Sequence, residues 1–199
     1  TLPEVQPDLL PLAPEGRYDL AQNKDGSWYA VQGDSVYLLD NDCLPSLLDA
    51  AGVQLRVFDA KPLYHIALEQ GGVGATIVFD GKLAAYLLNP SASDYQAGQL
   101  AAEYAAAPVF ACAAAPDAGA LSALLDVLST KLDEQGGHDL LATMELPLAR
   151  VLADMERIGF AVDAEGIRQF GDSLRAELNG ILQNIYAEVG YEFNLNSPK

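Results

Sequence analysis

Residues 28–39 of this chain read WYAVQGDSVYLL, and this stretch decides the class of fold. Two short runs rich in aromatic and β-branched residues, 28–31 and 36–39, stand on either side of Gly33 and Asp34. A Gly-Asp pair between two such runs is typical of a tight β-hairpin turn. The stretch therefore predicts two adjacent antiparallel strands.

Strand and helix patterns alternate around this hairpin. We expect further strands over 18–21, 55–58 and 75–79, and helices over 44–51, 62–70, 81–88, 94–106 and 117–134. Asp80 directly precedes the helix 81–88 and is expected to cap it. Because strands joined through helices pair in parallel, whereas a hairpin is antiparallel, the sequence predicts an α/β domain with a mixed sheet.

The two ends of the chain depart from this alternation. Residues 1–15 contain four prolines, which suits an extended connector and excludes a helix. Apolar residues then recur at helical spacing over 144–158 and 167–189, and Asp163 can cap the second of these helices. The short link between them favours an antiparallel helical hairpin. We thus expect a connector (1–15), an α/β domain (16–137) and a helical region (138–199).

The chain is strongly acidic, with 11 Lys and Arg against 28 Asp and Glu and a net charge of −17. A protein that binds nucleic acid by itself presents a basic surface to the phosphates, so charge alone argues against DNA binding. The apolar runs are too short to span a bilayer and no signal peptide is visible, which predicts a cytoplasmic protein without a membrane partner. Cys43 and Cys112 lie far apart, and we expect both to be reduced thiols.

The helical region carries a specific resemblance. The segments MELPL (144–148), VLADME (151–156), GFAVD (159–163) and YAEVGYEFNLNSPK (186–199) resemble, in order and spacing, the start of the polymerase domain of bacterial family A DNA polymerases. The resemblance implies that this region is the base of the thumb, which grips a DNA primer-template. It also implies DNA-backbone contacts from Asn194, Asn196, Ser197 and Lys199. The same residues suit a helix start, and a helix N-terminus is itself a phosphate site.

The α/β region is similar to the domain that precedes the thumb in these polymerases, above all over FDGKLAAYLLNP (79–90). That domain is a 3′–5′ exonuclease of ribonuclease-H-like fold, so the resemblance implies a ribonuclease-H-like mixed sheet flanked by helices. Its active members hold two divalent metals with a cluster of carboxylates. The positions that correspond to this machinery are degenerate here: Asp19 and Ala21 (for Asp-x-Glu), Asp59 and Leu63 (for Asn and Asp), Ala113 and Gly119 (for Tyr and Asp).

A single surviving carboxylate cannot hold two metals, so we expect no catalytic and no metal site in this chain. We expect the domain to act as a structural spacer. The Mg²⁺ ions of the parent polymerase would be held by its palm domain, which follows the thumb, and the fragment alone would bind DNA weakly or not at all.

Two other hypotheses remain open at this stage. The nuclease could survive with rearranged ligands such as Asp19, Asp59, Asp80 and Asp117. Alternatively, the chain could be a non-enzymatic acidic module that binds a basic partner protein. His65 stands alone on its helix, and we expect it to be structural.

Overall fold

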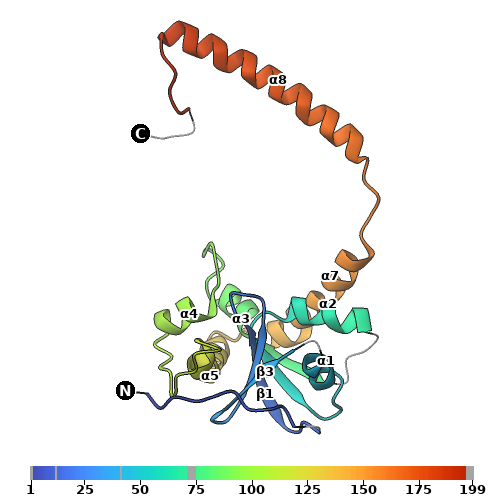
Figure 1. Ribbon diagram of the computed structural model, residues 1–199, viewed down its shortest axis with the longest axis vertical. Helices are drawn as coiled ribbons and strands as arrows, with labels where there is room; N and C mark the ends of the chain where they lie inside the picture. The colour runs from blue at the N-terminus through green and yellow to red at the C-terminus, as the bar shows by residue number, and fades with distance from the viewer. Residues whose placement is uncertain (1, 12, 41, 71–74, 196–199) are drawn as a thin grey trace. The chain divides into compact units, whose positions relative to one another are not determined.

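The computed structural model describes the chain except residues 1, 12, 41, 71–74 and 196–199 (Figure 1). The chain divides into two compact units, Thr1–Ile158 and Gly159–Lys199. The boundary falls after Ile158, whereas the sequence places it after residue 137. The difference arises because the helices that follow residue 137 pack onto the α/β domain.

The described residues of the first unit form a five-stranded mixed sheet with strand order β3-β2-β1-β4-β5. Its strands are β1 (Arg17–Gln22), β2 (Trp28–Gln32), β3 (Ser35–Leu39), β4 (Gln54–Val57) and β5 (Thr76–Asp80). The first three strands are antiparallel neighbours, and β1–β4 and β4–β5 are parallel. Gly33 and Asp34 form the turn between β2 and β3, with Gly33 at a φ of +60°. The predicted hairpin and the ribonuclease-H-like mixed sheet are therefore confirmed.

Helices cover both faces of this sheet. The helices of the first unit are α1 (Cys43–Leu48), α2 (Ala60–Gln70), α3 (Gly81–Leu88), α4 (Ala97–Glu103), α5 (Ala118–Glu134), α6 (His138–Leu140), the π-helical turn η1 (Leu141–Glu145) and α7 (Leu146–Ile158). Figure 1 shows α4 and α5 on one side of the sheet and α1 and α2 on the other. The leucines along one side of α5 are fully buried, which places the hydrophobic core between α5 and the sheet.

The N-terminal residues are extended, as predicted, but they lie along the domain instead of connecting freely to it. The backbone N–H of Val5 donates to the carbonyl of Ala111 at 2.8 Å, and that of Asp8 donates to the carbonyl of Val36 at 2.7 Å. Val5 and Leu10 also pack against the hydrophobic core. This segment is therefore part of the first unit.

Helix α7 attaches to α2 through small residues. Its buried residues are Leu146, Ala149 and Ala153. Alanines have small side chains and so allow the backbones of α7 and α2 to approach closely. The larger apolar residues of the helix lie exposed on its other side: Leu148, Val151, Leu152, Met155 and Ile158. Lys61 and His65 of α2 each contact the carboxylate of Glu156, at 2.8 and 2.9 Å. His65 thus joins two helices, in keeping with the structural role expected for it.

Within its described residues, the second unit contains one long helix, α8 (Ala164–Val189). The Asp163 carboxylate accepts a hydrogen bond from the backbone N–H of Gly166 at 2.8 Å, which confirms the predicted cap. The helix ends at Gly190, whose φ of +85° favours glycine. Because α7 and α8 belong to different units, their antiparallel arrangement stays a prediction. No helix within the described ranges is long and apolar enough to cross a membrane.

Candidate functional site

The candidate site comprises the positions where an active nuclease would hold its metals, beginning with Asp19 on β1. Asp19 lies beside Arg56 in the parallel register of β1 and β4. Arg56 donates from Nε to Asp19 Oδ1 at 2.7 Å and from Nη2 to Asp19 Oδ2 at 2.5 Å, and its Nη1 donates to Asp126 of α5. Both Asp19 and Arg56 are buried. The only acid that the first nuclease position retains is therefore neutralised by a guanidinium.

This ion pair keeps Arg56 charged in spite of its burial. Burial, the largest single effect, lowers the pKa of Arg56, but Asp19 and Asp126 together hold that pKa above its ordinary value. Ala21, two residues further along β1, is also buried and offers no ligand atom.

Asp59 stands at the second nuclease position, two residues after the end of β4. Its backbone has a φ of +75°, which is uncommon for a residue other than glycine. The ammonium group of Lys82, on α3, donates a hydrogen bond from Nζ to Oδ2 of the Asp59 carboxylate at 2.5 Å. Leu63, where active relatives would have an acid, is fully buried on α2. This position too has a carboxylate occupied by a cation of the protein.

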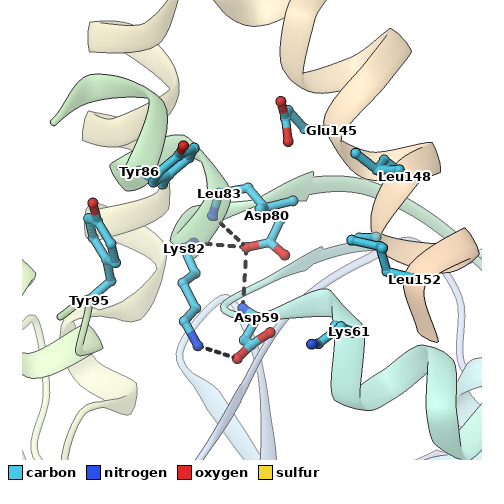
Figure 2. Close-up of a pocket in the computed structure, with 11 residues that line it drawn as sticks. Asp59, Lys61, Asp80, Lys82, Leu83, Tyr86, Tyr95, Glu145, Leu148 and Leu152 are labelled. Carbon is cyan, nitrogen blue, oxygen red and sulfur yellow. Dashed lines mark hydrogen bonds and ion pairs between the residues drawn. The ribbon is translucent and has the colours of Figure 1, made fainter. Parts of the chain in front are cut away.

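Asp80 caps α3, as predicted, and also holds the turn between β4 and α2 (Figure 2). Its carboxylate accepts hydrogen bonds from the backbone N–H groups of Asp59 (3.3 Å), Ala60 (2.7 Å), Lys82 (2.8 Å) and Leu83 (3.1 Å). Burial raises the pKa of Asp80 to about 6, although these N–H groups favour the charged form. The Asp80 side chain thus links the N-terminal turn of α3 to the backbone that leads into α2.

The third nuclease position lies before and within the first turn of α5. Ala113 is exposed in a turn, and Gly119 is buried inside the helix. The carbonyl of Gly119 accepts a hydrogen bond from the N–H of Val109 at 3.0 Å. This contact brings the backbone so close that a Cβ at position 119 would collide with the carbonyl oxygen of Phe110. A carboxylate at position 119 would therefore require the backbone to shift.

Asp59 and Asp117 line one cavity of about 520 Å³, together with Asn23, Lys24 and Lys82. Asp19 and Asp80 do not line it. Among the described residues, no three His, Cys, Asp or Glu side chains are grouped closely enough to hold a metal ion. Two carboxylates beside an ammonium group do not fit a pair of divalent metals.

The sequence predicts that acids are missing at the nuclease positions, but it gives no sign of the cations that lie beside the acids that remain. Arg56 and Lys82 were not singled out, although they neutralise Asp19 and Asp59. No local signal marks them, because their partners lie 37 and 23 residues away.

The predicted DNA contacts belong to the second unit. Asn194 is exposed and lies in the segment that follows Gly190. This segment folds back along α8, since the hydroxyl of Tyr186 donates to the carbonyl of Phe193 at 3.0 Å and the two rings are 5.8 Å apart. Asn196, Ser197 and Lys199 lie outside the described residues. DNA contact at these positions stays a prediction.

Comparison with known proteins gives the chain its relatives. No family model matches it. DNA polymerase I of Geobacillus stearothermophilus is 34% identical over 164 residues, which are 72% of this chain and 19% of that protein. DNA polymerase I of Bacillus subtilis is 31% identical over 166 residues, 72% of this chain and 18% of that protein. The chain thus spans about a fifth of the length of these curated relatives.

The solved structure of the POL domain of Pol1 from M. smegmatis, in complex with DNA primer-template and dNTP, has a similar fold. Its TM-score is 0.68 at 24% identity, and the match covers 97% of this chain and 39% of that one. The fold and the relatives together identify the chain as a segment of a family A DNA polymerase. More specifically, the chain is homologous to part of bacterial DNA polymerase I, which confirms the resemblance predicted from its sequence.

Proposed function

We propose that residues 16–137 are an inactive exonuclease-like domain that serves as a structural spacer in a DNA polymerase I, and that residues 138–199 begin its thumb. The parent enzyme transfers deoxynucleoside monophosphates from dNTPs to a primer 3′-OH. Its Mg²⁺ ions are held by carboxylates of the palm. This chain contributes no catalytic residue to that reaction.

The observation that carries the proposal is the state of the remaining acids. Proofreading hydrolysis needs several carboxylates free to bind two cations. Asp19 is paired with Arg56, Asp59 is paired with Lys82, and Leu63 and Gly119 supply no carboxylate. The two acids that remain at the nuclease positions, Asp19 and Asp59, are thus each compensated by a cation of the protein itself.

The thumb part of the proposal concerns DNA. Asn194, Asn196, Ser197 and Lys199 are proposed to contact the phosphate backbone in the parent enzyme. Short amides and hydroxyls bind phosphates without reading the bases, which suits a polymerase that must accept any sequence.

A nuclease assay tests the proposal. The chain is incubated with a 5′-labelled single-stranded oligonucleotide and Mg²⁺ or Mn²⁺, and an active 3′–5′ exonuclease serves as the positive control. We expect the oligonucleotide to remain intact. Shortening from the 3′ end that EDTA abolishes would refute the inactive domain and favour a nuclease with rearranged carboxylates.

A further inference from the structure

A second cavity, of about 340 Å³, lies within the first unit between α3 on one side and η1 and α7 on the other (Figure 2). Its walls are mostly apolar and partly aromatic: Leu83, Tyr86, Tyr95, Leu148, Ala149 and Leu152. The rings of Tyr86 and Tyr95 meet edge to face with 6.2 Å between their centroids. Small-molecule sites typically combine such walls with a few polar groups.

Most of the charged groups in this cavity already have partners. Lys82 is paired with Asp59 at 2.5 Å, and Lys61 is paired with Glu156 at 2.8 Å. The Asp80 carboxylate is surrounded by four backbone N–H groups. None of these groups requires a ligand to balance its charge.

Glu145 is different. It is half-buried, its carboxylate points toward the cavity in Figure 2, and within the described part of the chain no hydrogen bond or ion pair engages it. A carboxylate beside apolar walls is more costly than one in water unless a cation accompanies it. Glu145 is therefore an unpaired carboxylate in a cavity that is also lined by two aromatic rings.

The backbone at this point is also unusual. Glu145 is the last residue of the π-helical turn η1, which interrupts an otherwise continuous helical stretch from His138 to Ile158. Single π-helical turns within helices are rare and occur frequently at functional sites. This turn sets Glu145 among the residues of the cavity wall.

We propose that this cavity binds a hydrophobic organic cation, with the Glu145 carboxylate as its counter-ion and Tyr86, Leu148 and Leu152 around its apolar part. Aromatic rings attract cations through their faces, so Tyr86 and Tyr95, like Glu145, favour a positively charged ligand. The cation can be a free amine or the side chain of a Lys or Arg in a partner protein. The site does not depend on the inactivity of the exonuclease-like domain.

The test uses the whole chain and two probes of one shape. Phenethylammonium supplies the cation, and 2-phenylethanol supplies the same ring and length without charge. Binding is followed by the NMR shifts of the Leu148 and Leu152 methyl groups. We expect saturable shifts with phenethylammonium and about fivefold weaker binding of 2-phenylethanol, the size of a partly exposed ion pair.

Matched variants locate the charge. Glu145→Gln keeps the shape of the side chain and should weaken phenethylammonium about fivefold while leaving 2-phenylethanol unchanged. Glu134→Gln, on the exposed end of α5, should change neither probe. Leu152→Trp should fill the cavity and abolish both. Equal affinity of the two probes, or an unchanged affinity in Glu145→Gln, would overturn the proposal, and so would the absence of shifts with phenethylammonium.

A third probe distinguishes the sources of the cation. The blocked peptide acetyl-Leu-Arg-Leu-amide presents a guanidinium between apolar side chains. Tighter binding of this peptide than of phenethylammonium, lost in Glu145→Gln, supports the site with a protein side chain as its ligand. Weaker binding of the peptide than of phenethylammonium supports the site with a free amine as its ligand.

Discussion

At the scale of single residues, the proposed loss of the nuclease site rests on how the remaining acids of the first unit are compensated. A buried carboxylate needs a compensating charge or several hydrogen bonds. In an active enzyme a metal ion supplies that compensation, and here Arg56 supplies it for Asp19 and backbone N–H groups supply it for Asp80. The half-buried Asp59 is paired with Lys82. These contacts stabilise the domain and at the same time occupy the oxygens that a metal would need.

Arg56→Met tests the first of these contacts. The substitution leaves Asp19 buried without a partner, and we expect a loss of about 3–5 kcal/mol in the free energy of unfolding. Urea denaturation measures it. Arg175→Met, which breaks an exposed pair with Asp172 on α8, should cost at most about 1 kcal/mol. An Arg56→Met variant as stable as the parent chain would show that the pair does not stabilise the fold.

The pH dependence of stability should reveal Asp80. Its pKa is about 6 in the folded chain and about 3.8 ordinarily, so between these values the folded state holds a proton that the unfolded state has lost. Asp80 therefore makes the chain more stable at the acidic end of this window, and that contribution is lost as the pH rises through about 6.

Asp80→Asn isolates this effect, because the variant shares every other titrating group. The unfolding free energy of the parent chain minus that of the variant should fall between about pH 4 and about pH 7. Urea titrations at both pH values measure the difference. A difference that is constant, or that grows with pH, would contradict the raised pKa.

At the scale of elements, the sequence predicts those features that depend on neighbouring residues. The turn at Gly33 and Asp34, the helix that Asp80 caps and the long helix between Asp163 and Gly190 are all found where local signals place them. Features that depend on distant partners could not be predicted. The packing of α7 on α2, which carries the first unit to Ile158, is one example, and the capture of Asp19 by Arg56 is another.

Helix α8 is the element that depends most on local signals. None of its residues is buried within the structure, so its N-terminus is stabilised chiefly by the Asp163 cap. Asp163→Ala should destabilise the first turn of α8 by about 1 kcal/mol. Hydrogen exchange of the amides of residues 164–168 measures this loss as faster exchange. Gln183→Ala, at an exposed mid-helix position, should leave these amides unchanged, and equal exchange in both variants would show that the cap contributes nothing.

At the scale of the whole molecule, homology and charge point in different directions. The relatives are DNA polymerases, but this chain carries a net charge of −17. The two observations are compatible if the segment supplies a few phosphate contacts and other parts of the parent supply the positive charge. The homology also accounts for the 144–199 motifs, which an unrelated acidic interaction module would leave unexplained.

DNA binding by the isolated chain should therefore be weak. We expect no saturable binding to a primer-template duplex below about 0.1 mM protein at physiological salt, the weak end of non-specific affinities. Fluorescence anisotropy of a labelled duplex measures it across a salt series. Micromolar affinity that falls steeply with salt would show that the chain carries a DNA-binding surface of its own.

The central claim is that no metal binds at the nuclease positions, because the remaining acids are paired with cations of the protein. Titration with Mn²⁺, followed by amide NMR, tests this claim most directly. Mn²⁺ broadens the signals of nuclei close to it. An ion bound in the cavity of about 520 Å³ that Asp59 and Asp117 line would therefore erase the signals of these two residues before others. We predict that micromolar Mn²⁺ leaves both signals no broader than that of Glu134, an exposed acid on the same unit. Selective loss of the Asp59 and Asp117 signals at micromolar Mn²⁺, reversed by EDTA, would contradict the claim.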